Sequence, residues 1–240
     1  MAVTQVESVE RPLDNQIMRL FWPIFIFAEI SGVAAIILSG VWMSHYGHFE
    51  WTQKDVFNFH PVFMSVSMIF LFGQAIVLYR VLRFLPKRWL KISHFFFHLW
   101  IIILLSVGLA AAFDSHNFRN IPNLYSLHSW LGLALVTLYI AQFLGGVAVY
   151  LLPYAPFSVR VASMPFHRVL GMIMFGAAGA TALMGITEKA IFSSGQCWVN
   201  RTCAEADLIN WFGLTVIMYV ASILFLVATP DYRRQPLPTD

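Results

Sequence analysis

Six long apolar segments dominate this chain of 240 residues. Each is close to the length of about 20 apolar residues that an α-helix needs to cross the hydrocarbon core of a bilayer. The segments are residues 20–43, 57–79, 92–113, 125–152, 169–187 and 208–229. They lack the alternation of apolar and polar residues that is typical of a membrane barrel. The sequence therefore predicts an all-α, polytopic membrane protein with six transmembrane helices.

The composition agrees with this fold class. Apolar residues make up 59% of the chain and charged residues 11%, against roughly 25% charged residues in an ordinary soluble domain. The 15 Lys and Arg residues are few and dispersed, so we expect no nucleic-acid partner. The first segment is too long for the apolar region of a signal peptide and follows no small-residue cleavage site, so we expect it to be retained. The expected parts are an N-terminal tail (1–19), a membrane domain (20–229) and a C-terminal tail (230–240).

The basic residues between the segments predict the orientation. Six spans place both termini on one side, and most of the Lys and Arg residues lie on that side. The basic residues of the other side are Lys54, Arg119, Lys189 and Arg201. Because cytoplasmic loops of membrane proteins are enriched in Lys and Arg, both termini are expected in the cytoplasm.

A short motif in the last outer loop fits this orientation. Asn200-Arg201-Thr202 is an acceptor for N-glycosylation, and Cys197 and Cys203 flank it. Both glycosylation and a disulfide require a non-cytoplasmic compartment. The sequence leaves open whether the two cysteines pair and whether Asn200 is modified.

Four of the eight histidines lie near the ends of predicted helices. His60 and His128 lie near the outer ends of the second and fourth segments, which run parallel. His94 and His167 lie near the inner ends of the third and fifth segments, which also run parallel. Ionisable residues within membrane segments are costly and usually functional. We therefore expect two histidine pairs, one near each face of the membrane, each formed by two helices at matched depth.

A facing pair of imidazoles in a helix bundle suits a haem that is held by two axial ligands. Tetrahedral zinc needs three or four protein ligands, and a proton relay requires no pairing by depth. The two cysteines and the absence of a C-x-x-C-H motif exclude a four-thiolate iron–sulfur cluster within one chain and covalent haem attachment. We expect two haem b groups per chain, an outer one bound by His60 and His128 and an inner one bound by His94 and His167. His98 lies one helical turn after His94 and is the rival ligand.

Three further polar residues lie within the apolar segments. Gln74 follows His60 by 14 residues, and Gln142 follows His128 by 14 residues. At 1.5 Å per residue both glutamines lie about 21 Å deeper, near the level of the inner haem. They either contact the haem edge or form hydrogen bonds across helices, and the sequence leaves both alternatives open. Glu29 is the only acidic residue within a segment, and we assign it no role.

Several sequence stretches resemble a known family. They are FNFHP (57–61), AIVLYRVLR (75–83), NLYSLHSW (123–130), MPFH (164–167) and ATALMGITEK (180–189). Through them the chain resembles cytochrome b561, the ascorbate-reducible di-haem membrane proteins, over about residues 57–192, and the animal members are the most similar. The resemblance implies a four-helix haem-binding core formed by spans two to five. It also implies the same two ligand pairs.

The resemblance further implies two substrate sites. On the cytoplasmic side, the residues expected to bind ascorbate are Lys87, Lys91, Arg80 and Arg83. Anchoring by positive charges on the inner side explains the same loop without a substrate. On the outer side, Asn123, Tyr125 and Ser126 lie in the stretch that the family associates with monodehydroascorbate. His116 matches a histidine that binds metal in ferric-reducing relatives, and a solvated loop histidine is the alternative.

The expected function is transmembrane electron transfer from cytoplasmic ascorbate, through two b-type haems, to monodehydroascorbate or a ferric chelate on the other side. The resemblance implies a homodimer in a vesicle, lysosomal or plasma membrane. One alternative is a cytochrome b anchor subunit of a quinone-linked dehydrogenase, which ascorbate alone would reduce slowly. The other is a histidine-based proton-coupled transporter, which would bind no haem.

Overall fold

The computed structural model of the chain describes residues 2–238, and it describes side chains from Met18 onward. The described residues contain six helices that are long and apolar enough to cross a membrane, and they contain no strand. These spans are Met18–Ser44, Val56–Val81, Lys87–Arg119, Leu127–Leu151, Phe157–Ser193 and Glu205–Ala228. The prediction of an all-α protein with six spans is confirmed.

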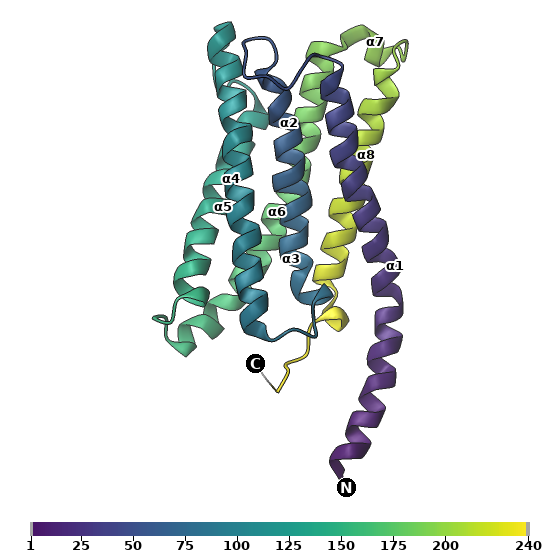
Figure 1. Cartoon of the computed structure of the whole chain (residues 1–240), viewed down its shortest axis with the longest axis vertical. Helices are drawn as coiled ribbons and strands as arrows, with labels where there is room; N and C mark the ends of the chain where they lie inside the picture. Colours follow the sequence, from purple (N-terminus) through teal and green to yellow (C-terminus); the bar gives the residue numbers. More distant parts are fainter. Residues whose placement is uncertain (1, 239–240) are drawn as a thin grey trace.

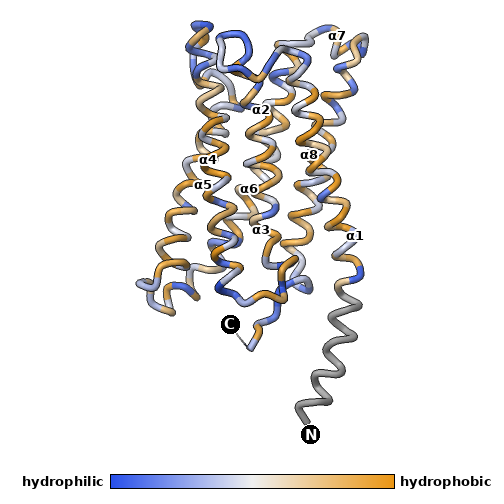
Figure 2. Tube along the Cα trace, in the orientation of Figure 1, coloured by the Kyte–Doolittle hydropathy of each residue, from blue (hydrophilic) through white to orange (hydrophobic). Residues whose placement is uncertain are grey.

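The helices stand side by side with their long axes roughly aligned (Figure 1). The long ones are α1 (Ala2–Ser44), α4 (Lys87–Arg119), α5 (Leu127–Gly146), α6 (Phe157–Ser193) and α8 (Glu205–Ala228). The beginning of α1 and the end of α8 lie at the same end of the bundle, as an even number of spans requires (Figure 1). Figure 2 shows that hydrophilic residues gather at the two ends of the bundle while the middle is largely apolar. This distribution is expected for a helix bundle that spans a bilayer.

The second span is not a uniform α-helix. It consists of a 3-10 turn (η1, Val56–Asn58), α2 (Phe59–Met64), a π-helical stretch (η2, Ser65–Leu71) and α3 (Phe72–Val81). Pro61 has no amide hydrogen to donate, and the hydroxyl of Ser65 donates to its carbonyl. The hydroxyl of Tyr219 on α8 donates to the carbonyl of Phe70, at 2.7 Å. Such π-helical stretches are frequent near functional sites.

Tyr219 also marks the crossing of α1, α8 and the second span. It is fully buried, and its ring stacks on Phe70, with 5.8 Å between the centroids. A Cβ atom at Gly32 would lie 2.8 Å from the rings of both Phe70 and Tyr219. Only glycine therefore allows α1 to approach this closely.

Three helices extend beyond the predicted apolar segments because hydropathy detects only the apolar part of a helix. The fifth span begins at Phe157 rather than at residue 169 and continues through Pro165. His167 therefore lies within the helix and not at its end. α1 begins at Ala2, so the described part of the predicted N-terminal tail is helical, whereas its membrane span, Met18–Ser44, begins close to the predicted residue 20. The third span likewise extends beyond 92–113, from Lys87 to Arg119.

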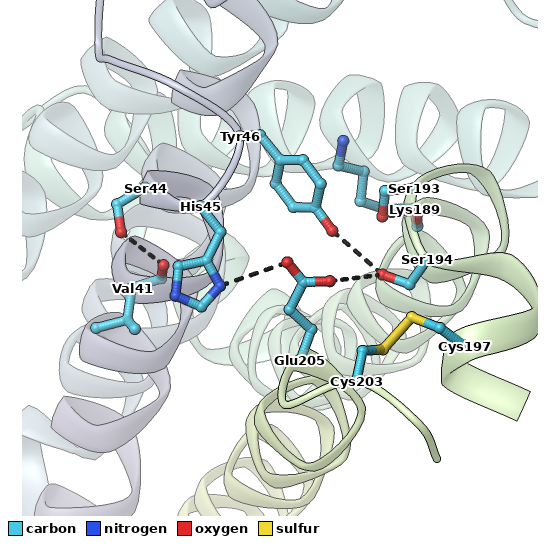
Figure 3. Close-up of polar contacts among 10 residues, drawn as sticks. All are labelled: Val41, Ser44, His45, Tyr46, Lys189, Ser193, Ser194, Cys197, Cys203 and Glu205. Carbon is cyan, nitrogen blue, oxygen red and sulfur yellow. Dashed lines mark hydrogen bonds and ion pairs between the residues drawn. A yellow bond between two sulfur atoms is a disulfide. The ribbon is translucent and has the colours of Figure 1, made fainter. Parts of the chain in front are cut away.

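The outer end of the bundle is held by polar contacts and a disulfide (Figure 3). Cys197 on α7 (Gly195–Val199) is bonded to Cys203, which answers the question that the sequence left open. His45 forms an ion pair with Glu205, with 3.6 Å between Nδ1 and Oε1. Ser194 donates to the other oxygen of Glu205 and contacts the hydroxyl of Tyr46. These contacts join the outer ends of α1, α6 and α8.

Candidate haem and substrate sites

The outer histidine pair joins two helices at the outer end of the bundle. His60 is the second residue of α2, and His128 is the second residue of α5. The centroids of the two imidazole rings are 6.1 Å apart. The Nδ1 atom of His60 contacts the carbonyl oxygen of Gly108 on α4 at 2.9 Å. The Nδ1 atom of His128 contacts the carbonyl oxygen of Thr181 on α6 at the same distance.

These carbonyl contacts fix the chemistry of the two rings. A carbonyl oxygen only accepts hydrogen bonds, so each Nδ1 atom carries the proton and donates it. Each Nε2 atom is then left with a lone pair, which is the form in which histidine binds a metal. The sequence located the ligands, whereas the carbonyls of Gly108 and Thr181 became visible only in the structure.

The inner histidine pair has a similar ring spacing, and one of its two rings also contacts a backbone carbonyl oxygen. The rings of His94 on α4 and His167 on α6 have centroids 6.4 Å apart. The Nδ1 atom of His94 donates to the carbonyl oxygen of Ala75 on α3, at 2.8 Å. The ring of His167 packs against that of Tyr150, with 5.1 Å between the centroids. The structure thus brings together His94 and His167, the two residues that helix direction paired.

The spacing of both pairs suits a bis-imidazole metal centre. A metal–imidazole bond is about 2 Å long and each nitrogen lies about 1 Å from its ring centre, so opposed ligands place their centroids roughly 6 Å apart. A cavity of about 570 Å³ adjoins His128 and is lined by residues of α5 and α6, including Leu183 and Phe192. A Cβ atom at Gly185 would lie 2.6 Å from the ring of His128. The ring spacing of each pair therefore fits a haem at each end of the bundle.

A third imidazole occupies the inner site. The Nε2 atom of His98 lies 3.1 Å from the Nε2 atom of His94, and its Nδ1 atom contacts the hydroxyl of Tyr139 at 2.5 Å. Tyr139 is buried on α5, and sequence reasoning missed it. The Nδ1 atom of His94, like those of His60 and His128, donates to a backbone carbonyl oxygen, whereas the Nδ1 atom of His98 contacts a side chain. This difference favours His94 as the ligand.

The two glutamines make contacts between helices. Gln74 donates to Glu29 at 2.6 Å and to the hydroxyl of Tyr219 at 3.2 Å. Gln142 donates to the carbonyl oxygen of His167 at 3.0 Å. The structure thus supports the alternative in which they bind across helices, and it gives Glu29 a partner. Gln142 also steadies the backbone that carries an inner ligand.

The four basic residues expected at the ascorbate site fall into two groups. Arg80 is buried and donates to the carbonyl oxygens of Val227 and Thr229, at the end of α8. Arg83 donates to the carbonyl oxygen of Arg233 in the C-terminal segment. Arg80 and Arg83 therefore hold the last residues of the chain against the bundle.

The second group lies at the beginning of α4. Lys87 is the first residue of this helix, and Lys91 follows one turn later. The ammonium group of Lys91 donates to the carbonyl oxygen of Tyr150 at 3.2 Å. It also lies close enough to Lys87 and Arg160 to feel their positive charges.

The outer polar residues lie around the cavity beside His128. The ring of His116 stacks on that of Tyr125, with 5.8 Å between the centroids, and the hydroxyl of Tyr125 donates to Glu188 at 3.0 Å. Partial burial and the hydrogen bond to Glu188 raise the pKa of Tyr125 to about 12, so its hydroxyl keeps its proton at neutral pH. Tyr125 and Glu188 line the cavity. Sequence reasoning did not select Glu188.

The other two predicted outer residues have local partners. Asn123 donates to the side chain of Asn117 at 2.9 Å. The hydroxyl of Ser126 caps α5 by accepting from the amide of Ser129. Ser126 lines the cavity, but its side chain is already used in the cap.

Comparisons with known proteins agree with this geometry. The plasma membrane ascorbate-dependent reductase CYBRD1 of Xenopus laevis is 40% identical to this chain over 222 residues, which is 89% of this chain and 77% of the relative. A CYB561 homologue of Caenorhabditis elegans is 35% identical and covers 95% of this chain and 90% of the relative. The transmembrane ascorbate-dependent reductase CYB561 of Sus scrofa is 35% identical over 87% of this chain and 82% of the relative. Residues 59–193 match the eukaryotic cytochrome b561 family. This chain therefore belongs to the eukaryotic cytochrome b561 family, which binds haem b.

Proposed function

We propose that this chain is an ascorbate-dependent transmembrane oxidoreductase that carries electrons from cytoplasmic ascorbate, through two haem b groups, to an acceptor on the other side. The observation that carries the proposal is the presence of two histidine pairs at opposite ends of one bundle, with ring centroids 6.1 Å and 6.4 Å apart. The relatives named as ascorbate-dependent reductases support it. The family disfavours both the anchor subunit and the transporter.

The four ligand histidines hold the cofactors and set their positions. Haem b, when bound between these pairs, supplies the one-electron redox chemistry. His60 and His128 would hold the outer group, and His94 and His167 the inner one. Because two imidazoles would hold each haem, the site is suited to electron transfer rather than to binding of oxygen. The carbonyl contacts at Nδ1 keep three of the rings in the orientation and tautomer that binding requires.

The beginning of α4 is the proposed ascorbate site. Ascorbate is an anion at neutral pH, and the amides at a helix N-terminus attract anions. Lys87 and Lys91 lie one turn apart on the same face of α4 and add two positive charges there. His94 follows Lys91 by less than one turn, which brings the bound donor close to the inner haem. Arg80 and Arg83 support the site by holding the adjacent chain.

The cavity beside His128 is the proposed outer acceptor site. Its lining includes the carboxylate of Glu188 and no Lys or Arg, and His116 stacks on its wall residue Tyr125. Carboxylate and imidazole groups are ligands of transition metals, whereas a carboxylate repels an anion. This observation favours ferric iron over monodehydroascorbate as the acceptor.

The orientation, membrane and oligomeric state complete the proposal. The basic residues at the end of the bundle that holds the termini favour a cytoplasmic location for both termini. The membrane is a vesicle, lysosomal or plasma membrane, and the protein is a homodimer.

Reconstitution into liposomes tests this function. The holoprotein is placed in vesicles that contain trapped ferricyanide, and ascorbate is added outside. Molecules whose basic loop faces outward should transfer electrons inward, and their haem should cycle between reduced and oxidised forms. A lysine-directed reagent that does not cross the membrane should abolish transfer in this fraction by blocking Lys87 and Lys91. Haem that ascorbate reduces only from the opposite side would contradict the assigned direction.

A further inference from the structure

A lysine ammonium group is enclosed by aromatic rings at the outer end of the bundle. The Nζ atom of Lys189, near the end of α6, lies 4.2 Å from the ring centroid of Tyr46 and 5.1 Å from that of Phe57. Figure 3 shows its side chain beside Tyr46, next to the contacts that join α1, α6 and α8. Cations at these distances from aromatic ring centres are attracted to the rings. The charge of Lys189 is therefore held in a defined place, and Lys189 is not among the residues that line the cavity beside His128.

The same rings lead to an outer haem ligand. The ring centroid of Phe57 is 5.7 Å from that of His60. The ammonium group of Lys189 thus lies no more than about 11 Å from the imidazole of His60. The space between them is filled by an aromatic ring rather than by water, so the charge is weakly screened.

The carboxylate of Glu205, which acts on Lys189, is engaged elsewhere. Glu205 acts on Lys189 through its charge, but its two oxygens face His45 and Ser194. These contacts are drawn in Figure 3. Arg119 adds a second positive charge to the surroundings of Lys189. The field of the lysine therefore reaches the outer pair without a direct ion pair to neutralise it.

We propose that Lys189 is a positioning residue that raises the reduction potential of the outer haem, acting through Phe57 and His60. This inference rests on the proposed function, because it requires a haem between His60 and His128. Adding one electron to that haem adds one negative charge, and a fixed positive charge nearby stabilises the reduced form. At a separation near 11 Å and an effective dielectric constant near 20, the attraction changes the reduction equilibrium by roughly tenfold. A tenfold change corresponds to 59 mV for a one-electron couple.

A redox titration of the purified holoprotein tests the proposal. Lys189→Met removes the charge and keeps the apolar stem, whereas Lys189→Arg keeps the charge. Arg201→Gln is the matched control, because Arg201 is an exposed outer cation that pairs with Asp207. The titration of His60→Ala identifies which of the two redox transitions belongs to the outer haem.

The expected result is specific to one haem and one variant. Lys189→Met should lower the equilibrium constant for reducing the outer haem by roughly tenfold, and the inner transition should stay in place. Lys189→Arg and Arg201→Gln should stay within twofold of the unmodified protein. If Lys189→Met fails to retain haem, Lys189→Gln is titrated against Lys189→Arg under the same criterion.

Two results would overturn the proposal. They are an unchanged outer transition without the charge, or an equal shift of both transitions. A wild-type protein that binds fewer than two haems would instead contradict the proposed function. The haem count, made before the titration, distinguishes that failure from a failure of the role of Lys189.

Discussion

The two histidine pairs have nearly the same spacing but different surroundings. Both histidines of the outer pair, His60 and His128, form hydrogen bonds with backbone carbonyl oxygens. This pair adjoins a cavity whose lining includes Tyr125 and Glu188. The inner pair shares its site with His98 and lies close to the basic beginning of α4. The proposed haem ligands are therefore alike at the two ends of the bundle, whereas the residues around them differ. We infer that these surroundings assign the donor to one face and the acceptor to the other.

The outer pair offers the prediction with the largest effect. His128→Ala should reduce the haem content from two per chain to one, because His128 is one of the two imidazoles that are proposed to hold the outer haem. Ascorbate should still reduce the remaining haem, and transfer to an outer acceptor should stop. Haem quantification and the visible spectrum measure both effects. His45→Ala, which alters an outer histidine that pairs with Glu205, is the control and should keep both haems.

Variants at the inner site test which of the two histidines of α4, His94 or His98, binds the inner haem. His94→Asn should remove the inner haem or convert it to a differently ligated form. His98→Asn should keep two haems and move only the inner absorption band, because Tyr139 then loses its partner. Electron paramagnetic resonance of the oxidised protein separates the two ferric signals. The reverse outcome would assign the ligand to His98.

The two basic groups at the inner end should differ in their kinetic roles. Lys87→Ser combined with Lys91→Ser should raise the ascorbate concentration for half-maximal reduction by about tenfold, since a hydrogen bond to a charged group contributes roughly 1.5–3 kcal/mol. Stopped-flow measurement of haem reduction tests this effect, and added salt should weaken binding less in the variant than in the wild type. Normal ascorbate kinetics in the double variant would show that these two lysines do not bind ascorbate.

Arg80 should give the smallest kinetic effect and a measurable effect on stability. Arg80→Met leaves the carbonyl oxygens of Val227 and Thr229 without their donor, which costs about 1–3 kcal/mol. The melting temperature of the detergent-solubilised holoprotein should fall, while the ascorbate dependence of reduction should stay within about twofold. A large change in the ascorbate dependence of reduction with an unchanged melting temperature would show that Arg80 binds the substrate instead.

The fold was largely readable from the sequence because the bilayer imposes length and apolarity on each span. Helix direction alone then paired His60 with His128 and His94 with His167. Hydropathy failed at helix ends that extend beyond the apolar region. It therefore placed His167 at the end of a helix that begins at Phe157.

The side-chain partners were less predictable than the ligands. The carbonyls of Gly108, Ala75 and Thr181 carry no sequence signal, because every residue has a carbonyl group. Arg80 looked like a substrate ligand in a basic loop, and only the packing of α8 showed which oxygens it contacts. Tyr139 gave no signal because an isolated tyrosine in an apolar segment resembles any core residue. Glu188, by contrast, stood in the family stretch 180–189 and could have been chosen for its charge.

The central claim is that each histidine pair holds one haem that ascorbate can reduce. A visible spectrum of the purified protein, recorded before and after ascorbate with haem quantified per chain, tests it most directly. The account predicts two b-type haems per chain, both reduced by ascorbate. One haem per chain, or two haems that dithionite reduces and ascorbate does not, would contradict it.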